Sequence, residues 1–310
     1  MQPVQSPLTA AAQWVRNRRG DRRRVPRRDV ANKVLDELLA QVAAGGTEKR
    51  VVVMVAHPDD EAIGAGALLR GIPGAVVVHL TDGAPAADEY AQLKGFVSRA
   101  DYAAARRREV VTALQVMGIP EESVRGLGFV DGELAWNLVA VCHAVMGVID
   151  ELKPDVILTH PYEGGHSDHD SVAFAVHMAS GILQCEGAAA PVVLELTSYH
   201  NYNGRRRVFD FLPLGGEVAR TYRLTTELRW LKRRMYSQFT SQQAVLETFP
   251  IAVERFRCAP RYLFTVPPHD GQLDYELRCR KISGAQWRDQ AESALRALRS
   301  RRQFSVGKSA

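Results

Sequence analysis

Cysteine is scarce in this chain and scattered. The 310 residues contain four cysteines, with no C-x-x-C pair and no regular spacing between them. A disulfide framework needs paired cysteines at recurring spacings, so none is expected. Isolated reduced thiols are typical of intracellular proteins, and the sequence therefore predicts a cytoplasmic protein.

Long apolar segments and targeting signals are also lacking. No apolar run approaches the roughly 18 residues needed to cross a bilayer, and the N-terminus lacks the ordered charged, apolar and small-residue regions of a signal peptide. The G-x-G-x-x-G fingerprint does not follow the first expected strand, so a dinucleotide-binding role has little support. We expect no transmembrane segment and no export by the general route.

Positive charge is concentrated at the two ends of the chain. The net charge is +5, yet residues 16–28 carry eight arginines against one aspartate, and residues 278–310 carry nine Lys or Arg against two acidic residues. The centre is therefore acidic. Clustered arginine can neutralise nucleic-acid phosphates, but neither end has interleaved aromatics or a known binding module. We expect solvated arms or contacts within a homo-oligomer, and nucleic acid is the less favoured partner.

Strand and helix patterns alternate between about residues 50 and 200. Short, β-branched apolar runs are typical of strands buried on both faces of a parallel sheet, and they occur at 51–55, 75–80, 156–159 and 192–197. Helical spacing of apolar residues occurs at 29–44, 61–70, 98–117, 137–151, 170–184 and 230–243. The alternation predicts an α/β fold with a Rossmann-like, doubly wound, mostly parallel sheet. In such a sheet, ligands bind beyond the carboxyl ends of the strands.

An imidazole and three carboxylates directly follow the first expected strand. The sequence there is AHPDDE, residues 56–61, and burying four such groups is costly unless they have partners. His57 and Asp60 are three residues apart across a tight turn, so they can converge on one ion while Asp59 points elsewhere. Zinc binds imidazole nitrogen and carboxylate oxygen, and its catalytic sites keep one position open for water. The alternative is that an aspartate only caps the next helix.

A second cluster follows the strand expected at 156–159. The stretch 160–170 reads HPYEGGHSDHD, and its two glycines allow a close backbone approach. A third metal ligand is expected here, because neighbouring parallel strands end at the same edge of the sheet. Two His/Asp clusters placed in this way favour a metal site over a simple helix cap.

AHPDDE followed about a hundred residues later by GHSDH resembles the paired motif of the LmbE-like, or PIG-L, deacetylase family. The resemblance covers about residues 48–270, between a basic N-terminal arm and helix at 1–47 and a basic C-terminal extension at 271–310. Ser167 stands where the family usually has proline, while every His and Asp of the motif is present. It implies a single domain that uses zinc, or alternatively Fe²⁺, to remove an N-acetyl group from an amino-sugar-containing glycan, lipid or metabolite.

The resemblance also implies a role for each polar residue of the two motifs. Asp59 would be the general base, and His166 would stabilise the oxyanion and protonate the leaving amine. Asp168 is expected to orient a histidine without binding the metal itself. Amide hydrolysis needs such a base and oxyanion donor beside a metal that acidifies water. The implied metal ligands are His57, Asp60 and His169.

Two further residues are expected to contact the substrate. Arg106 lies in the R-R-R-E run of the helix at 98–117, and Asp131 lies in the stretch 129–132, where similar family members bring sugar-binding side chains into the cleft. A solvated arginine and a turn aspartate are the equally weighted alternatives. Lys232 matches a family stretch that we interpret as structural.

Two rival functions stay open at this point. The same fold and metal could hydrate a small unsaturated carboxylic acid, which would need basic residues in the pocket. Alternatively, the basic arms could bind nucleic acid beside a vestigial site, although the undamaged His and Asp residues of the two motifs argue against this.

Overall fold

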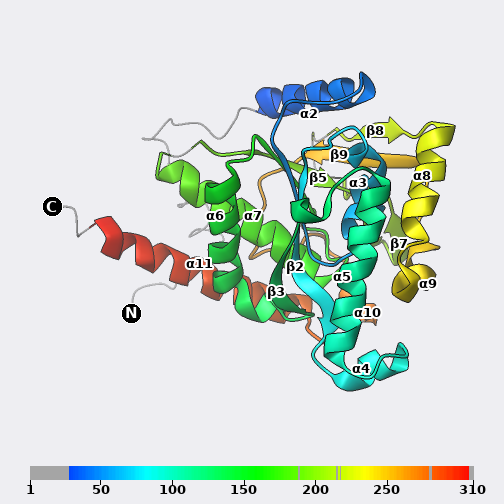
Figure 1. The fold of residues 1–310 in the computed structure, drawn as a ribbon. Helices are drawn as coiled ribbons and strands as arrows, with labels where there is room; N and C mark the ends of the chain where they lie inside the picture. The colour runs from blue at the N-terminus through cyan, green and yellow to red at the C-terminus, as the bar shows by residue number, and fades with distance from the viewer. Residues whose placement is uncertain (1–27, 188, 214–215, 217, 279–280, 307–310) are drawn as a thin grey trace, which may run out of the picture.

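A seven-stranded sheet forms the centre of the protein in a computed structural model (Figure 1). The structure describes residues 28–306, apart from 188, 214–215, 217 and 279–280. The basic arm expected before residue 28 therefore lies outside the described residues. Two short strands, β6 (Tyr199–Tyr202) and β7 (Arg205–Val208), form a separate antiparallel hairpin.

The strand order of the main sheet is β3-β2-β1-β4-β5-β9-β8. The first five strands in this order are parallel, and β9 and β8 add an antiparallel edge. The strands are β1 (Val51–Val55), β2 (Val76–Pro85), β3 (Val124–Asp131), β4 (Val156–Thr159), β5 (Val192–Leu196), β8 (Arg220–Arg223) and β9 (Val253–Cys258). The expected mostly parallel α/β sheet is confirmed.

Helices cover both faces of the sheet, and each face has its own apolar core (Figure 1). One core joins the strands to α2 (Arg28–Ala43), α3 (Asp60–Leu69), α5 (Arg99–Val116) and α8 (Thr226–Tyr236). The other joins them to α6 (Leu138–Leu152), α7 (Ser167–Cys185) and α11 (Gly284–Val306). The five residues of β1 are all buried, as expected for a strand covered on both faces.

The order of the strands reverses between β1 and β4. From β1 the chain proceeds to β2 and β3 on one side, and β4 and β5 lie on the other side. Such a switch point leaves a crevice beyond the carboxyl ends of the two central strands. The motif at 56–61 follows β1 and the motif at 160–170 follows β4, so the topology brings both to this crevice.

Some elements differ from the expectation. Helix α7 begins at Ser167 rather than near 170, so Asp168 and His169 lie in its first turn. The helix expected at 230–243 is α8, which ends at Tyr236 before a short turn and α9 (Gln243–Leu246). Strands β3, β8 and β9 were not expected, because their polar or mixed sequences lack a continuous apolar run.

One segment, Leu134–Leu152, has the length and composition of a membrane-crossing helix, with 19 residues and mean hydropathy 1.3. The sequence analysis did not anticipate it. In the structure α6 packs its apolar face against α7 and α11 in the second core, which is the position of a core helix.

The C-terminal α11 also packs on this core through the buried Trp287. The domain boundaries at 48 and 271 stay a prediction.

Candidate metal centre and active site

His57, Asp60 and His169 converge at the switch point. Nδ1 of His57 lies 3.2 Å from Oδ2 of Asp60, and Nε2 of His169 lies 3.1 Å from Oδ1 of Asp60. Ligand atoms that share one tetrahedral zinc ion, with bonds of about 2.0–2.2 Å, are about 3.3–3.6 Å apart. All three side chains are buried. Their donor types and the two distances to Asp60 fit a divalent metal ion such as zinc.

His57 is held from the other side of its ring by two carboxylates. Its Nε2 lies 3.3 Å from Oδ2 of Asp168 and 3.2 Å from Oδ1 of Asp131. Asp168 is fixed in turn by the backbone N–H groups of Gly132 and Leu134. A proton on Nε2 satisfies these acceptors, so Nδ1, which faces Asp60, is the nitrogen that would bind an ion once its own proton is released. This is how carboxylates behind a metal ligand fix its tautomer.

Ionisation at the cluster follows from burial and from these contacts. Burial by itself would raise the pKa of Asp60, but His169 and His160 outweigh it and hold that pKa well below its ordinary value. Burial lowers the pKa of His169 to about 4, despite the charge of Asp60. Burial would also lower the pKa of His57, but Asp131, Asp168 and Asp60 raise it well above its ordinary value. An ionised Asp60 and a neutral His169 are the forms that bind metal.

Asp59 is bound to Arg106 and does not cap the helix that follows it. It precedes the first residue of α3, yet its side chain makes no capping hydrogen bond. Nη2 of Arg106 donates to Oδ2 of Asp59 at 3.0 Å and to the carbonyl of Pro58 at 2.9 Å, and Nη1 donates to the carbonyl of Gly83. Burial raises the pKa of Asp59 to about 6, against the lowering effect of the Arg106 charge. The capping alternative is therefore excluded for Asp59.

Arg106 and Asp131 lie at the site, but their contacts in the structure are with protein groups. The Arg106 side chain is 4% exposed and is occupied by Asp59 and backbone carbonyls. This interaction orients Asp59, so the expected contact with substrate stays a prediction for Arg106. Asp131 ends β3, touches His57 and lines a cavity. Its expected contact with substrate also stays a prediction.

His166 lies at the start of α7 with its ring edge-on to His57, at a centroid distance of 4.7 Å. The backbone N–H of Asp168 donates to its Nδ1 at 3.2 Å. Burial lowers the pKa of His166 to about 4, assisted by the neighbouring His57. In the neutral ring the proton must then be on Nε2, because Nδ1 is an acceptor. His166 can therefore offer one N–H donor to a ligand.

The structure also brings His160 to the cluster, a residue that was not among the expected site residues. Its ring stacks on His169 with a centroid distance of 3.9 Å, and its Nε2 accepts the N–H of Ala56 and lies 3.3 Å from Asp60. His160 is fully buried. Its place directly after β4, equivalent to that of the first motif after β1, was the available signal.

Two glycines allow the second motif to approach the hairpin strand β6. Gly164 has φ +73°, a conformation that favours glycine. A Cβ atom at Gly165 would collide with the backbone carbonyl oxygen of Tyr199. The ring of Tyr199 lies edge-on to His169 at 5.6 Å. The close backbone approach expected from the sequence is confirmed.

Three overlapping groups of side chains among the described residues have donor atoms close enough to hold an ion. Each group contains at least one of the expected ligands. They are His57 with His166 and His169, Asp60 with His160 and His169, and His57 with Asp131 and Asp168. The set of His57, Asp60 and His169 draws on the first two groups and stays a prediction.

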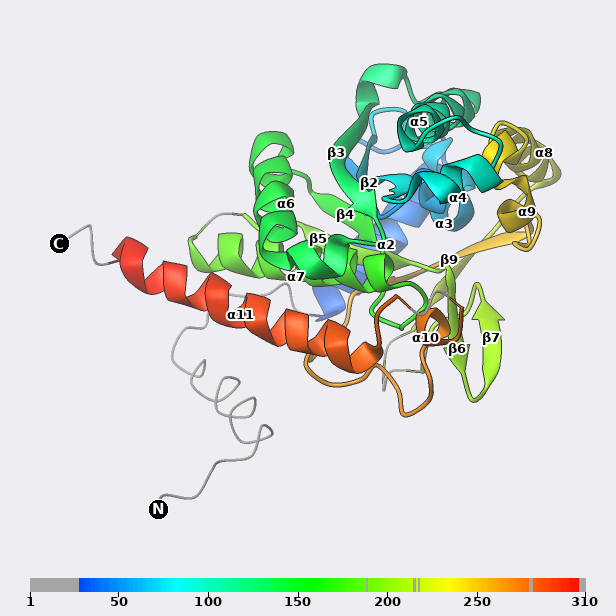
Figure 2. The same ribbon diagram turned by 90° about the horizontal axis from the view of Figure 1, so that it is seen from below.

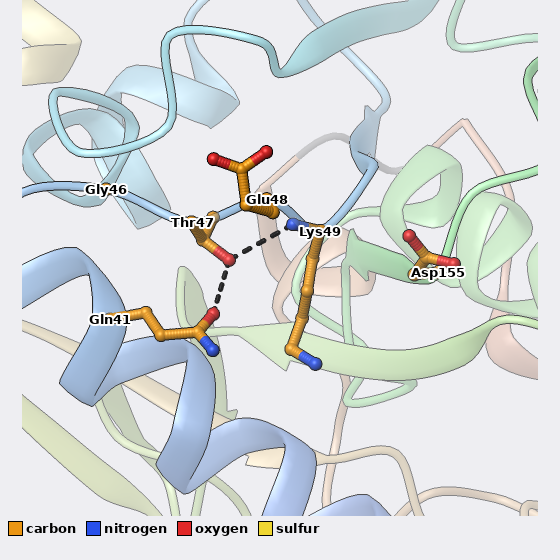
Figure 3. Close-up of a pocket in the computed structure, with 6 residues that line it drawn as sticks. All are labelled: Gln41, Gly46, Thr47, Glu48, Lys49 and Asp155. Atoms are coloured by element: carbon orange, nitrogen blue, oxygen red, sulfur yellow. Dashed lines mark hydrogen bonds between the residues drawn. The ribbon is translucent and has the colours of Figure 1, made fainter.

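Two cavities lie at opposite edges of the sheet. The smaller, of about 390 Å³, is lined by Asp131 and by residues that follow β2 and β3, at the edge that faces the viewer in Figure 2. The larger, of about 500 Å³, lies before β1 and β4, between Gln41, Lys49 and Asp155 (Figure 3). Parallel α/β sheets bind ligands at the carboxyl edge, so the smaller cavity is the one connected with the cluster.

Part of the chain is similar in sequence to known proteins. Residues 52–180 match the family described as PIG-L: GlcNAc-PI de-N-acetylase. The chain is 32% identical over 139 residues to a probable N-acetyl-alpha-D-glucosaminyl L-malate deacetylase 2 of Bacillus cereus, and 30% identical over the same length to the Bacillus subtilis protein of that name. These matches cover 42% of this chain, which spans about 60% of the length of the two relatives.

Solved structures are similar in fold. A deacetylase from the biosynthesis pathway of teicoplanin superimposes with a TM-score of 0.52 at 19% identity, over 67% of this chain and 96% of that one. At this identity the likeness concerns the arrangement of the sheet and helices.

Proposed function

We propose that this chain, whose residues 52–180 are a PIG-L (LmbE-like) family domain, removes an N-acetyl group from an amino-sugar-containing substrate with the help of a divalent metal ion. One observation carries the proposal. A carboxylate, Asp59, and an imidazole donor, His166, lie beside a His/Asp/His set of metal-binding character at the switch point of the sheet. The names of the two Bacillus relatives support the acyl group and the sugar.

His57, Asp60 and His169 would hold the ion, and zinc is the metal that we favour. A zinc ion bound there would act as a Lewis acid and lower the pKa of water to about 7. The chain itself supplies the acid and base groups. Arg106 keeps Asp59 oriented through a hydrogen bond of 3.0 Å. Asp59 takes the proton of the attacking water and returns it to the leaving nitrogen.

His166 and Asp168 complete the arrangement. The Nε2–H of His166 is a donor for the carbonyl oxygen as it gains negative charge. The same N–H is the only proton of the neutral ring, so the structure favours Asp59 over His166 for protonating the amine. Asp168 holds the proton on Nε2 of His57, which keeps Nδ1 available as a ligand.

The rival reactions have less support. Hydration of an unsaturated dicarboxylic acid needs several basic groups in the pocket. Among the described residues that line the cavity beside Asp131, the one basic side chain is Lys281, and Arg106 is occupied by Asp59. The N-terminal arm, one of the two basic arms invoked for nucleic-acid binding, lies outside the described residues, so the structure does not test that alternative.

The test is acetate release from a panel of N-acetylated amino sugars and their glycosides, with metal content measured. Asp59→Asn should keep its metal and lose about 10²–10⁴-fold in kcat, the usual contribution of general acid–base catalysis. Asp155→Asn, at the opposite edge of the sheet, is the matched control and should stay near wild type. A metal-loaded Asp59→Asn that retains full activity would show that Asp59 is not the base, and a wild type that binds no divalent metal would refute the proposal.

A further inference from the structure

The cavity beside Asp131 is lined mainly by residues outside the groups that would react. Asp131 lines it and touches Nε2 of His57 at 3.2 Å. The rest of the wall consists of the short apolar stretch 85–87 together with Tyr90, Gly132, Glu133, Trp136 and Lys281. Its volume of about 390 Å³ lies within the range of ligand pockets, about 300–1,000 Å³. Apart from Gly132, whose N–H binds Asp168, none of these further residues has a role in the chemistry proposed above.

Two residues with large aromatic side chains line this cavity from different elements. Trp136 belongs to the short helix η3 (Leu134–Asn137), which follows β3, and is 49% exposed. Tyr90 belongs to α4 (Asp88–Leu93), which follows β2, and is 40% exposed. Aromatic rings of this size are normally covered, because each can bury 150–250 Å². The ring of Tyr90 packs partly against Tyr102 and Lys94, and Trp136 is the more exposed of the two. A partly exposed ring at a cavity beside a reacting centre suits a ligand with a flat, partly apolar face.

The polar groups of the cavity include both a donor and an acceptor. Nζ of Lys281 lies against Gly132, where a Cβ atom would come within 3.1 Å of it, and Gly132 has φ +83°. Glu133 is the next residue along the wall. Neither Lys281 nor Glu133 forms an ion pair with a described residue. An ammonium and a carboxylate of this kind can bond the hydroxyl groups of a neutral ligand.

We propose that this cavity is a subsite for a second sugar ring, attached to the amino sugar that loses its acetyl group. A pyranose ring combines apolar C–H faces for Trp136 and Tyr90 with hydroxyl groups for Lys281 and Glu133. A simple alkyl chain would use the aromatic rings but leave both charged groups without a partner. The proposal rests on the proposed function and narrows its substrate class to disaccharides or longer glycosides.

The test compares three substrates of the zinc-loaded enzyme. They are N-acetylglucosamine, its β-linked disaccharide and its octyl glycoside, assayed by acetate release. Trp136→Ala should lower kcat/KM about tenfold for the disaccharide, the scale of one lost aromatic contact, and leave the monosaccharide within about twofold. Trp136→Phe should recover most of the loss. Trp230→Ala removes an equally exposed tryptophan on α8 (52% exposed) and is the matched control.

Calorimetric titration of the disaccharide gives a second readout, with Asp59→Asn introduced into both proteins so that hydrolysis contributes little heat. The protein with the wild-type Trp136 should bind the disaccharide, and Trp136→Ala should bind it about tenfold more weakly. The subsite would be overturned if Trp136→Ala lowered kcat/KM equally for the monosaccharide and the disaccharide. It would also be overturned if the enzyme preferred the octyl glycoside and Lys281→Met left that preference unchanged. If no sugar releases acetate, the proposed function fails. The subsite is refuted separately by the binding measurement, if Trp136→Ala binds the disaccharide as tightly as wild type or if wild type does not bind it.

Discussion

At the scale of single residues, His57 is the residue on which the site depends most. One ring nitrogen faces Asp60, and the other faces Asp131 and Asp168. The N–H donors of Gly132 and Leu134 fix the carboxylate of Asp168 in position. Asp168 therefore contributes to metal binding through His57, without being a ligand.

Replacing Asp168 tests this arrangement. Asp168→Asn keeps the shape of the side chain but removes the charge that favours a proton on Nε2 of His57. We expect zinc affinity to fall about 10–100-fold, as for other residues behind metal ligands. Competition with a chromophoric chelator measures the change.

The matched control is Asp150→Asn, an aspartate exposed on α6. Its zinc affinity should equal that of wild type. Unchanged affinity in Asp168→Asn as well would mean that Asp168 does not act through His57.

At the scale of elements, helix α3 carries Asp60 at its start and is held by a buried ion pair. Nζ of Lys232 lies 2.6 Å from Oε1 of Glu254, and both side chains are fully buried. Lys232 also donates to the carbonyl of Ile63, while Glu254 accepts the N–H of Ala67. In a regular α-helix the N–H of Ala67 would donate to the carbonyl of Ile63. The ion pair of Lys232 and Glu254 therefore bonds both of these backbone groups at one turn of α3. The interpretation of Lys232 as structural agrees with these contacts.

Lys232→Met should destabilise the protein strongly. It leaves Glu254 as a buried carboxylate without its cation, and breaking a buried pair in this way costs about 3–5 kcal/mol. The free energy of unfolding in urea measures the loss.

Arg50→Met provides the comparison, because Arg50 pairs with Asp155 at the surface, with side chains 60% and 45% exposed. Surface pairs contribute about 0–1 kcal/mol. If the two variants were equally stable, the inserted pair would not support α3.

At the scale of the whole molecule, the C-terminal helix α11 packs on one helical layer of the sheet and contacts the helix α7, which leads to the site. Trp287 of α11 is fully buried, and its Nε1 donates to the carbonyl of Ser167 at 3.1 Å and to Oγ of Ser171 at 3.0 Å. Ser167 begins α7, two residues before His169. Figure 2 shows α11 running beside α7, with α6 at a steep angle to both. Helix α11 is therefore packed, through Trp287, against the helix that carries a proposed metal ligand.

Trp287→Ala should lower the free energy of unfolding by about 3–5 kcal/mol, the usual cost of emptying a large aromatic site. Trp287→Phe keeps a ring but loses the indole N–H, and should cost less. Thermal and denaturant unfolding measure both. Trp230→Ala, which removes an exposed ring, should change stability by no more than about 0.5 kcal/mol. A Trp287→Ala protein as stable as the control would show that α11 is a dispensable attachment.

The sequence by itself determined the parallel centre of the sheet and the positions of both motifs. Strands such as 51–55 are apolar on both faces, and that pattern is local. Polar groups placed directly after two such strands must meet, because parallel strands end at one edge. His57 and Asp60 could be selected in this way, with a third ligand expected in the second motif. The choice of His169, and the roles of Asp59 and His166, came from the family resemblance.

Only the tertiary structure decided which groups these residues face. Arg106 binds Asp59, which lies 47 residues away in the sequence, and His57 contacts Asp168, which lies 111 residues away. His160 stacks on His169 within the segment between β4 and the first turn of α7. The strands β3, β8 and β9 and the docking of α11 escaped the sequence patterns for the same reason. Contacts between distant segments depend on packing, which leaves no periodic or local signal in either segment alone.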